Sequence, residues 1–128
     1  MEMHFYHVTA DKLHHSVVVV FFDTKTGGDE ENDFITNIFT TPDSDKIVEN
    51  EESWTPIGIH LEALLMKLDR SKLFHYEGSL TVPPCTENVE WNIINDPQPI
   101  SKEQLELFTT KWSKRPEFAG GRGNNRRT

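Results

Sequence analysis

The amino-acid sequence predicts a mainly β fold of the α+β class, and three stretches carry that prediction. Residues 2–8 alternate in the pattern of a strand with two different faces. Residues 16–22 form a β-branched and aromatic run, which is typical of a central strand that is apolar on both faces. Residues 89–94 alternate again, and the segments with helical spacing are short. The length of 128 residues favours a single domain.

The connections between the strands have the composition of turns and loops. A turn over residues 11–15 is expected to leave His14 and His15 on the surface, because adjacent strand residues point to opposite faces. Residues 23–33 form a glycine-rich acidic loop whose carboxylates lack the spacing of a calcium loop, so a solvated loop is favoured. Residues 95–99 contain two prolines and predict a turn after the last strand.

Three short helices are expected on the periphery of the sheet. Their ranges are residues 34–39, 57–68 and 102–112. Asn32 or Asp33 can cap the first helix. The second has apolar residues on one stripe, which fits packing against the sheet. Ser101 with Gln104 three positions later forms a capping box that opens the third helix.

The composition argues against several classes of function. The net charge of -8 argues against binding to nucleic acids or anionic membranes. No apolar run approaches the roughly 18 residues that a membrane-spanning helix requires. The residues after Met1 do not form a signal peptide. The glycine- and arginine-rich tail over residues 117–128 is expected to be solvated.

The most specific stretch is Tyr-Glu-Gly-Ser-Leu-Thr-Val-Pro-Pro-Cys-Thr-Glu at residues 76–87. Gly78 and Ser79 favour a turn, and the next three residues favour an extended run. Pro83 and Pro84 then prevent a helix from starting, and such a pair is a plausible place for a cis peptide bond. From the residues alone, the simple interpretation is a strand that ends at a rigid corner.

His4 is the first candidate for a metal ligand. In a strand it shares a face with Glu2 and Tyr6, while Met3 and Phe5 point the other way. A metal site needs this arrangement, because one ring nitrogen binds the metal while the other donates to a carboxylate. The alternative is an ordinary strand with a hydrogen-bonded histidine, since a metal site needs more ligands than this segment offers.

Taken together, the motifs resemble the α-class carbonic anhydrases, in the family's order and over nearly the whole chain. They are the stretch at residues 76–87, Glu-Met-His-Phe-Tyr-His at 2–7, Trp91, and Gly-Asn-Asn-Arg at 123–126. The resemblance implies a large, twisted, mostly antiparallel sheet with short peripheral helices. It also implies that residues 1–128 are the C-terminal portion, roughly half, of one such domain, so that the fold is incomplete.

The resemblance also assigns roles to individual residues. His4 matches the third zinc-ligating histidine and Glu2 the carboxylate that orients it. Thr81 matches the catalytic threonine, whose hydroxyl aims the attacking hydroxide at carbon dioxide. The wall of the apolar carbon dioxide pocket is matched by Val17, Leu80, Val89 and Trp91. Tyr6 and Val82 also match positions of this pocket: Tyr6 stands where the family usually has a small aliphatic residue, and Val82 replaces a frequent second threonine.

Cys85 is the single cysteine of the chain. In secreted and lumenal members of the family, the cysteine at this position forms a disulfide with one near the amino terminus. That partner is absent here, so either a piece of the molecule is missing or the bond goes to another chain. This cysteine favours a secreted or lumenal ancestry and leaves the compartment open, an organelle assembly included.

The expected function is reversible hydration of carbon dioxide to bicarbonate at a zinc site. The other two zinc ligands of the family form a His-x-His pair that this sequence lacks. Zinc is therefore expected only if another segment or chain supplies them, and the chain alone is expected to be inactive. The alternative is a catalytically inactive carbonic anhydrase-related subunit of a larger assembly. An unrelated binding module is the weakest hypothesis.

Overall fold

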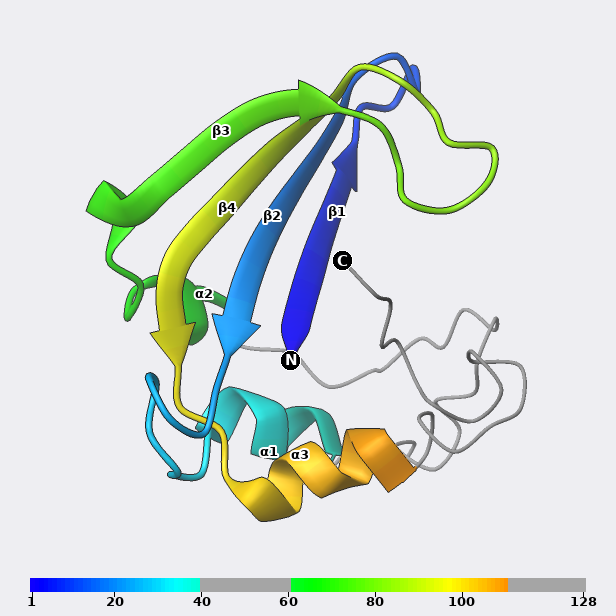
Figure 1. The fold of residues 1–128 in the computed structure, drawn as a ribbon. Coiled ribbons are helices and arrows are strands. Elements are labelled where there is room, and N and C mark those ends of the chain that lie inside the picture. The colour runs from blue at the N-terminus through cyan, green and yellow to red at the C-terminus, as the bar shows by residue number, and fades with distance from the viewer. Residues whose placement is uncertain (40–60, 111–128) are drawn as a thin grey trace.

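The computed structural model describes residues 1–39 and 61–110 (Figure 1). Its strands are β1 (Glu2–Val8), β2 (His15–Phe22), β3 (Leu73–Gly78) and β4 (Val89–Gln98). Its helices are α1 (Asp33–Phe39), α2 (Leu61–Leu65), the short 3-10 helix η2 (Arg70–Lys72) and α3 (Lys102–Phe108). The second helix, expected to run to residue 68, is seen from Leu61 and ends earlier, at Leu65. Its start, the connector before it and the tail over residues 117–128 lie outside the described residues.

The strands form one 4-stranded sheet in the order β1-β2-β4-β3. β1 pairs with β2 and β3 with β4 in antiparallel fashion, while the central pair β2 and β4 is parallel. The sheet is therefore mostly antiparallel, as expected. Figure 1 shows its twist, with α1 and α3 at one end and the 79–88 loop at the other.

The two faces of the sheet carry different layers. One face packs with the helices around a core of Val20, Phe22, Phe34, Ile35, Leu64, Leu68, Ile94 and Ile100. The opposite face carries a second apolar cluster, formed by Val17, Val19, Val89 and Trp91, with Phe21, Leu80 and Ile93 packed against it. This second face also holds Glu2, His4 and Tyr6, because alternate residues of β1 share one side.

The capping predictions are confirmed. Asn32, rather than Asp33, caps α1, since its Oδ1 accepts from the backbone N–H groups of Phe34 and Ile35. Ser101 and Gln104 form the expected capping box at the start of α3. The α-helix runs to Phe108 and residues 109–110 continue as π-helix, while the last two expected residues, 111 and 112, lie outside the described residues.

Two predictions about the strands are wrong. The turn expected over residues 95–99 is part of β4, which continues to Gln98. Pro97 is tolerated there because the register with β2 shifts between Val20 and Phe22, which leaves Pro97 without a partner residue. The extended run expected over Leu80–Val82 is a loop, and the strand of this region is β3, which precedes it.

Candidate functional site

The pair of Glu2 and His4 lies at the centre of the candidate site. Both side chains leave β1 on the same face, two residues apart. Oε1 of Glu2 lies 3.5 Å from Nε2 of His4. This contact places the carboxylate beside Nε2 and leaves Nδ1 as the ring nitrogen available to a metal. The rings of His4 and Trp91 form a T-shaped contact, with centroids 5.3 Å apart and planes at 81°.

The predicted pocket wall forms one apolar cluster. Val17 of β2 and Trp91 of β4 are directly paired. Val89 lies two residues before Trp91 on β4, on the same face. Leu80 reaches the same cluster from the loop that follows β3. Tyr6 lies opposite Val17 and is 48% exposed. Four residues assigned to the wall from the sequence are therefore brought together beside His4.

Several local contacts fix the loop over residues 79–88. Nε1 of Trp91 donates to the carbonyl of Ser79 at 3.1 Å, which ties the loop to the sheet. The backbone N–H of Leu80 donates to the carbonyl of Thr86 at 2.9 Å. A Cβ at Gly78 would come within 3.2 Å of the Tyr76 ring and 3.3 Å of Trp91, so the strand end suits glycine. This end of β3 therefore sets where the loop begins.

The loop carries Thr81, Val82 and Cys85 on the rim of the site, and all three are exposed. The peptide bond between Pro83 and Pro84 is cis. Within the described residues, Thr81 makes no hydrogen bond to Glu2 or His4, so the structure does not join the expected catalytic threonine to the histidine. Cys85 has its φ at 58° and is free among these residues.

The donor set for a metal is incomplete in the part of the chain that the structure describes. No group of three or more His, Cys, Asp or Glu side chains is placed to hold a metal ion there. Catalytic zinc sites use three protein ligands. His4 with Glu2 fits one ligand position of such a site and no more.

His15 was missed by the sequence analysis, which placed it on the surface within a turn. It is the first residue of β2 and shares the site face. Its Nδ1 lies 2.5 Å from the hydroxyl of Tyr6, and the two rings stack with centroids 5.9 Å apart and planes at 17°. Extending the alternation of β2 back by one residue pair, from Val17, would have found it.

The charged residues with shifted pKa values lie away from these side chains. A hydrogen bond from the backbone N–H of Asp69, with the ammonium of Lys72, holds the pKa of the Asp96 carboxyl below its usual value. The hydrogen bond from the Lys102 side chain likewise lowers the pKa of Asp29. These pairs fasten loops to β4 and α3, so their role is structural.

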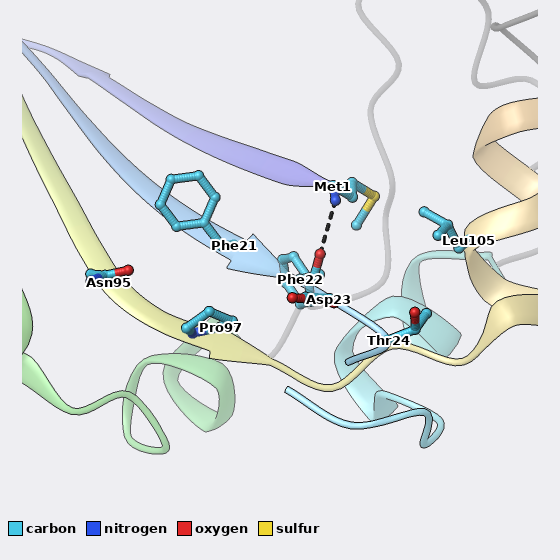
Figure 2. A pocket seen from close by; sticks show the side chains of 8 residues that line it. All are labelled: Met1, Phe21, Phe22, Asp23, Thr24, Asn95, Pro97 and Leu105. Atoms are coloured by element: carbon cyan, nitrogen blue, oxygen red, sulfur yellow. Dashed lines mark hydrogen bonds between the residues drawn. The ribbon is translucent and has the colours of Figure 1, made fainter. Parts of the chain in front are cut away.

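A hollow of about 460 Å³ lies at the helix end of the sheet (Figure 2). Its lining residues are Met1, Phe21, Phe22, Asp23, Thr24, Asn95, Pro97 and Leu105. The terminal amino group of Met1 donates to the carbonyl of Phe22 at 2.8 Å beside it. None of the residues assigned to the site lines this hollow, so it does not mark the chemistry.

Comparison with known proteins identifies the family. The model of the eukaryotic-type carbonic anhydrases matches residues 1–128. The chain belongs to this family. It is 36% identical over 109 residues to alpha carbonic anhydrase 3 of Arabidopsis thaliana, a match that covers 85% of this chain and 36% of the relative.

Solved carbonic anhydrases share the fold. The alpha-carbonic anhydrase of Photobacterium profundum superposes with a TM-score of 0.67 at 31% identity, covering 86% of this chain and 46% of that one. The fungal enzyme of Aspergillus oryzae gives 0.67 at 31% identity, covering 84% and 44%. The carbonic anhydrase fold expected from the motifs is thus confirmed, and the chain spans less than half the length of these relatives.

A helix that crosses a membrane must be both long and apolar. Among residues 1–39 and 61–110, no helix of this carbonic anhydrase chain is long and apolar enough to cross a bilayer.

Proposed function

We propose that this carbonic anhydrase chain contributes one side of a zinc site for reversible hydration of carbon dioxide. The observation that carries the proposal is the Glu2–His4 pair, with Nε2 held by the carboxylate at 3.5 Å beside an apolar wall. Zinc, when bound, lowers the pKa of a coordinated water to about 7, which makes hydration feasible at neutral pH. To this site the chain would contribute one metal ligand, the carboxylate that orients that ligand, and the apolar wall beside it.

Each residue then has a physical role. His4 offers Nδ1 to the metal, and Glu2 keeps the proton on Nε2 and strengthens the ligand. The side chains of Val17, Val89 and Trp91 make the surroundings of His4 apolar, which suits a substrate without a strong polar handle. By resemblance, the Thr81 hydroxyl accepts the proton of the attacking group in a hydrogen bond.

The proposal requires two further zinc ligands from outside the described residues or from another polypeptide. A second candidate function is a metal-free structural subunit that keeps the carbonic anhydrase fold. The absence of a three-ligand group among the described residues favours this alternative. Tyr6 and Val82, at positions where the family has smaller or hydroxylated residues, favour it as well.

The zinc content of the protein distinguishes the zinc-site proposal from the metal-free structural subunit. We would measure zinc per chain by elemental analysis in protein purified from its native source, and in His4→Ala and His7→Ala variants expressed there. His7 is a matched control because it lies on the same strand, is exposed, and points to the other face. About one zinc per chain, lost only in His4→Ala, is expected. Zinc absent from the native protein would support the structural subunit.

Catalysis is tested on the same material by stopped-flow carbon dioxide hydration, with sulfanilamide as inhibitor. His4→Ala is expected to abolish hydration, while His7→Ala retains it. Thr81→Val should lower kcat/KM by about 100-fold, the typical contribution of one positioned hydrogen-bonding group near the reacting atoms. Full zinc occupancy without hydration would contradict the enzymatic proposal and leave a metal-binding structural role.

A further inference from the structure

The outer side of β3 is the strongest unassigned feature of the molecule. β3 is the last strand in the sheet order, so it lies at one edge of the sheet (Figure 1). Among residues 1–39 and 61–110, no backbone group pairs with this outer side. In an antiparallel ladder, every second residue directs its N–H and C=O groups away from the neighbouring strand. β3 therefore presents a row of backbone groups to which a further strand can bind.

The side chains of β3 do not shield this edge. Phe74 is 59% exposed and Tyr76 is 48% exposed on the site face, and Leu73 is 47% exposed on the face that carries the helices. Edge strands of soluble proteins are usually shielded by charged side chains, a proline or a bulge. The other edge strand, β1, has Met3 and Phe5 packed against the core. The exposed apolar edge of β3 thus has the character of a site for strand addition.

Glu77 adds an unmatched charge to the same edge. It lies directly opposite Glu90 of β4, and both residues are exposed. Like charges in directly opposite positions of a sheet repel each other. No cationic side chain of the described residues forms an ion pair with either carboxylate. A hydrogen-bonding or cationic group placed beyond β3 would reduce this repulsion.

His75 can supply that group, because its ring is held by one nitrogen only. Its Nδ1 lies 3.2 Å from Oδ1 of Asn92, and the amide nitrogen of Asn92 donates to Oγ of Ser16 at 3.2 Å. An amide oxygen can only accept, so Nδ1 carries the proton of this contact. Nε2 has no hydrogen-bond partner among the described residues and remains for a group outside the sheet.

We infer that β3 pairs with β3 of a second copy of this chain, antiparallel, around a two-fold axis perpendicular to the sheet. Directly opposite residues of such a pair share a face, so the axis must pass beside a residue and not between two residues. With the axis at Tyr76, His75 of each copy lies opposite Glu77 of the other. Phe74 of each copy then lies opposite Gly78 of the other.

The register centred on Tyr76 is complementary in charge and in shape. It gives each Glu77 an imidazole neighbour and sets the large ring of Phe74 against a glycine, an arrangement that suits sheet edges. A register centred on His75 would instead oppose the two imidazoles and place Leu73 opposite Glu77. An interface around a two-fold axis uses the same patch on both copies, so each favourable contact occurs twice.

The inference goes beyond the proposed function and does not depend on zinc. A two-fold axis perpendicular to the sheet keeps both site faces on the same side of one continuous sheet. Each copy would also cover the exposed apolar edge of the other. The predicted species is therefore a homodimer joined through backbone hydrogen bonds between the two β3 strands.

The first test is sedimentation velocity of the full chain over a range of concentrations. Wild type should associate to a dimer. Phe74→Lys and Glu77→Lys should each weaken dimerisation by about 10-fold or more, because each altered contact occurs twice. Val8→Lys is the matched control, since Val8 is 45% exposed on the opposite edge strand. A wild-type chain that stays monomeric at every concentration overturns the inference.

Glu77→Lys also separates dimerisation from folding. In the single chain it replaces the repulsion between Glu77 and Glu90 by an attraction, so the urea midpoint of the monomer should not fall. Dimerisation should nevertheless weaken. Circular dichroism would check the fold of each variant, and Glu77→Lys takes the place of Phe74→Lys if the latter is unfolded. A dimer that is unaffected by both substitutions overturns the inference.

A charge exchange tests the register itself. His75→Glu alone should weaken dimerisation, because it sets a carboxylate opposite Glu77 of the second copy. Adding Glu77→Lys should restore it, because residues 75 and 77 again carry complementary groups across the axis. A double variant that associates no better than His75→Glu overturns the proposed pairing. Native protein that is found only with a different polypeptide on β3 would overturn it as well, whatever its zinc content.

Discussion

At the scale of single residues, Gln104 joins two helices that are far apart in the sequence. Its Oε1 accepts from the backbone N–H of Asn32 at 2.9 Å, and its Nε2 donates to the carbonyl of Asn32 at 3.0 Å. The same amide nitrogen donates to Oγ1 of Thr36 at 2.8 Å. The sequence predicts the capping role of Gln104 within α3. Its link to α1 depends on how the helices pack, which no local pattern encodes.

Replacing Gln104 by alanine should lower the free energy of unfolding by about 2–3 kcal/mol, because buried backbone groups of Asn32 lose their partners. Urea denaturation of the full chain would measure the change. Glu103→Ala on the same helix is the control, since Glu103 is exposed. Equal effects of the two substitutions would contradict a special role for the Gln104 amide.

Asp96 should make the stability of the chain depend on pH. The backbone N–H of Asp69 and the ammonium of Lys72 lower the pKa of its carboxyl below 3.8. A carboxyl with a lowered folded-state pKa stabilises the fold above its unfolded pKa, and this contribution is lost as pH falls through the folded value.

Asp96→Asn should therefore lower the free energy of unfolding at neutral pH by about 1 kcal/mol or less, since the pair is largely solvent-screened. The difference from wild type should begin to shrink as pH falls below about 4, where the carboxyl of the unfolded chain becomes protonated, and should vanish once pH falls below the lowered folded-state pKa. Denaturation curves at pH 7 and pH 3 would show this. A difference that grows toward pH 3 would refute the assigned role.

At the scale of elements, a prediction from the sequence succeeds where neighbouring residues determine the element and fails where contacts with distant strands determine it. The alternation of β1 and the capping box of α3 are local patterns, and both predictions hold in the structure. The extension of β4 to Gln98 was missed because Pro97 predicts a turn. Only the register shift against β2, which is a tertiary feature, makes room for the proline.

The loop after β2 packs closely on the end of β4. A Cβ at Gly27 would come within 2.3 Å of the backbone oxygen of Gln98, which cannot move away as a side chain could. Gly27→Ala should therefore lower the free energy of unfolding by about 2–3 kcal/mol through overpacking. Thermal unfolding would measure it beside the exposed control Lys25→Ala. An unchanged midpoint for Gly27→Ala would show that the loop can shift.

At the scale of the whole molecule, Trp91 connects the parts of the candidate site. It forms a T-shaped contact with His4, stacks on Tyr76 with ring centroids 6.1 Å apart, and donates to the carbonyl of Ser79 in the loop. The motifs marked Trp91, His4 and Leu80 as members of one site. Their meeting in space could not be read from periodicity, because it depends on the strand order β1-β2-β4-β3.

Trp91→Phe should release the loop over residues 79–88 from the sheet, since phenylalanine cannot donate to Ser79. We expect a loss of about 1–2 kcal/mol in the free energy of unfolding. Amide hydrogen exchange should also accelerate in the loop more than in the helices. Tyr76→Phe is the control, because it keeps a stacked ring beside Trp91. Uniform acceleration throughout the chain would argue against a specific anchor.

The parallel pairing at the centre of the sheet governs when the site can form during synthesis. His15 of β2 is paired with Val89 of β4, so the two strands meet only after the chain between them has been made. Closing a loop of that length costs about 4 kcal/mol of chain entropy before any contact compensates it. The ribosome must therefore release β4 before His4 can meet Trp91, and until then the site face of the hairpin formed by β1 and β2 lacks its partner strand.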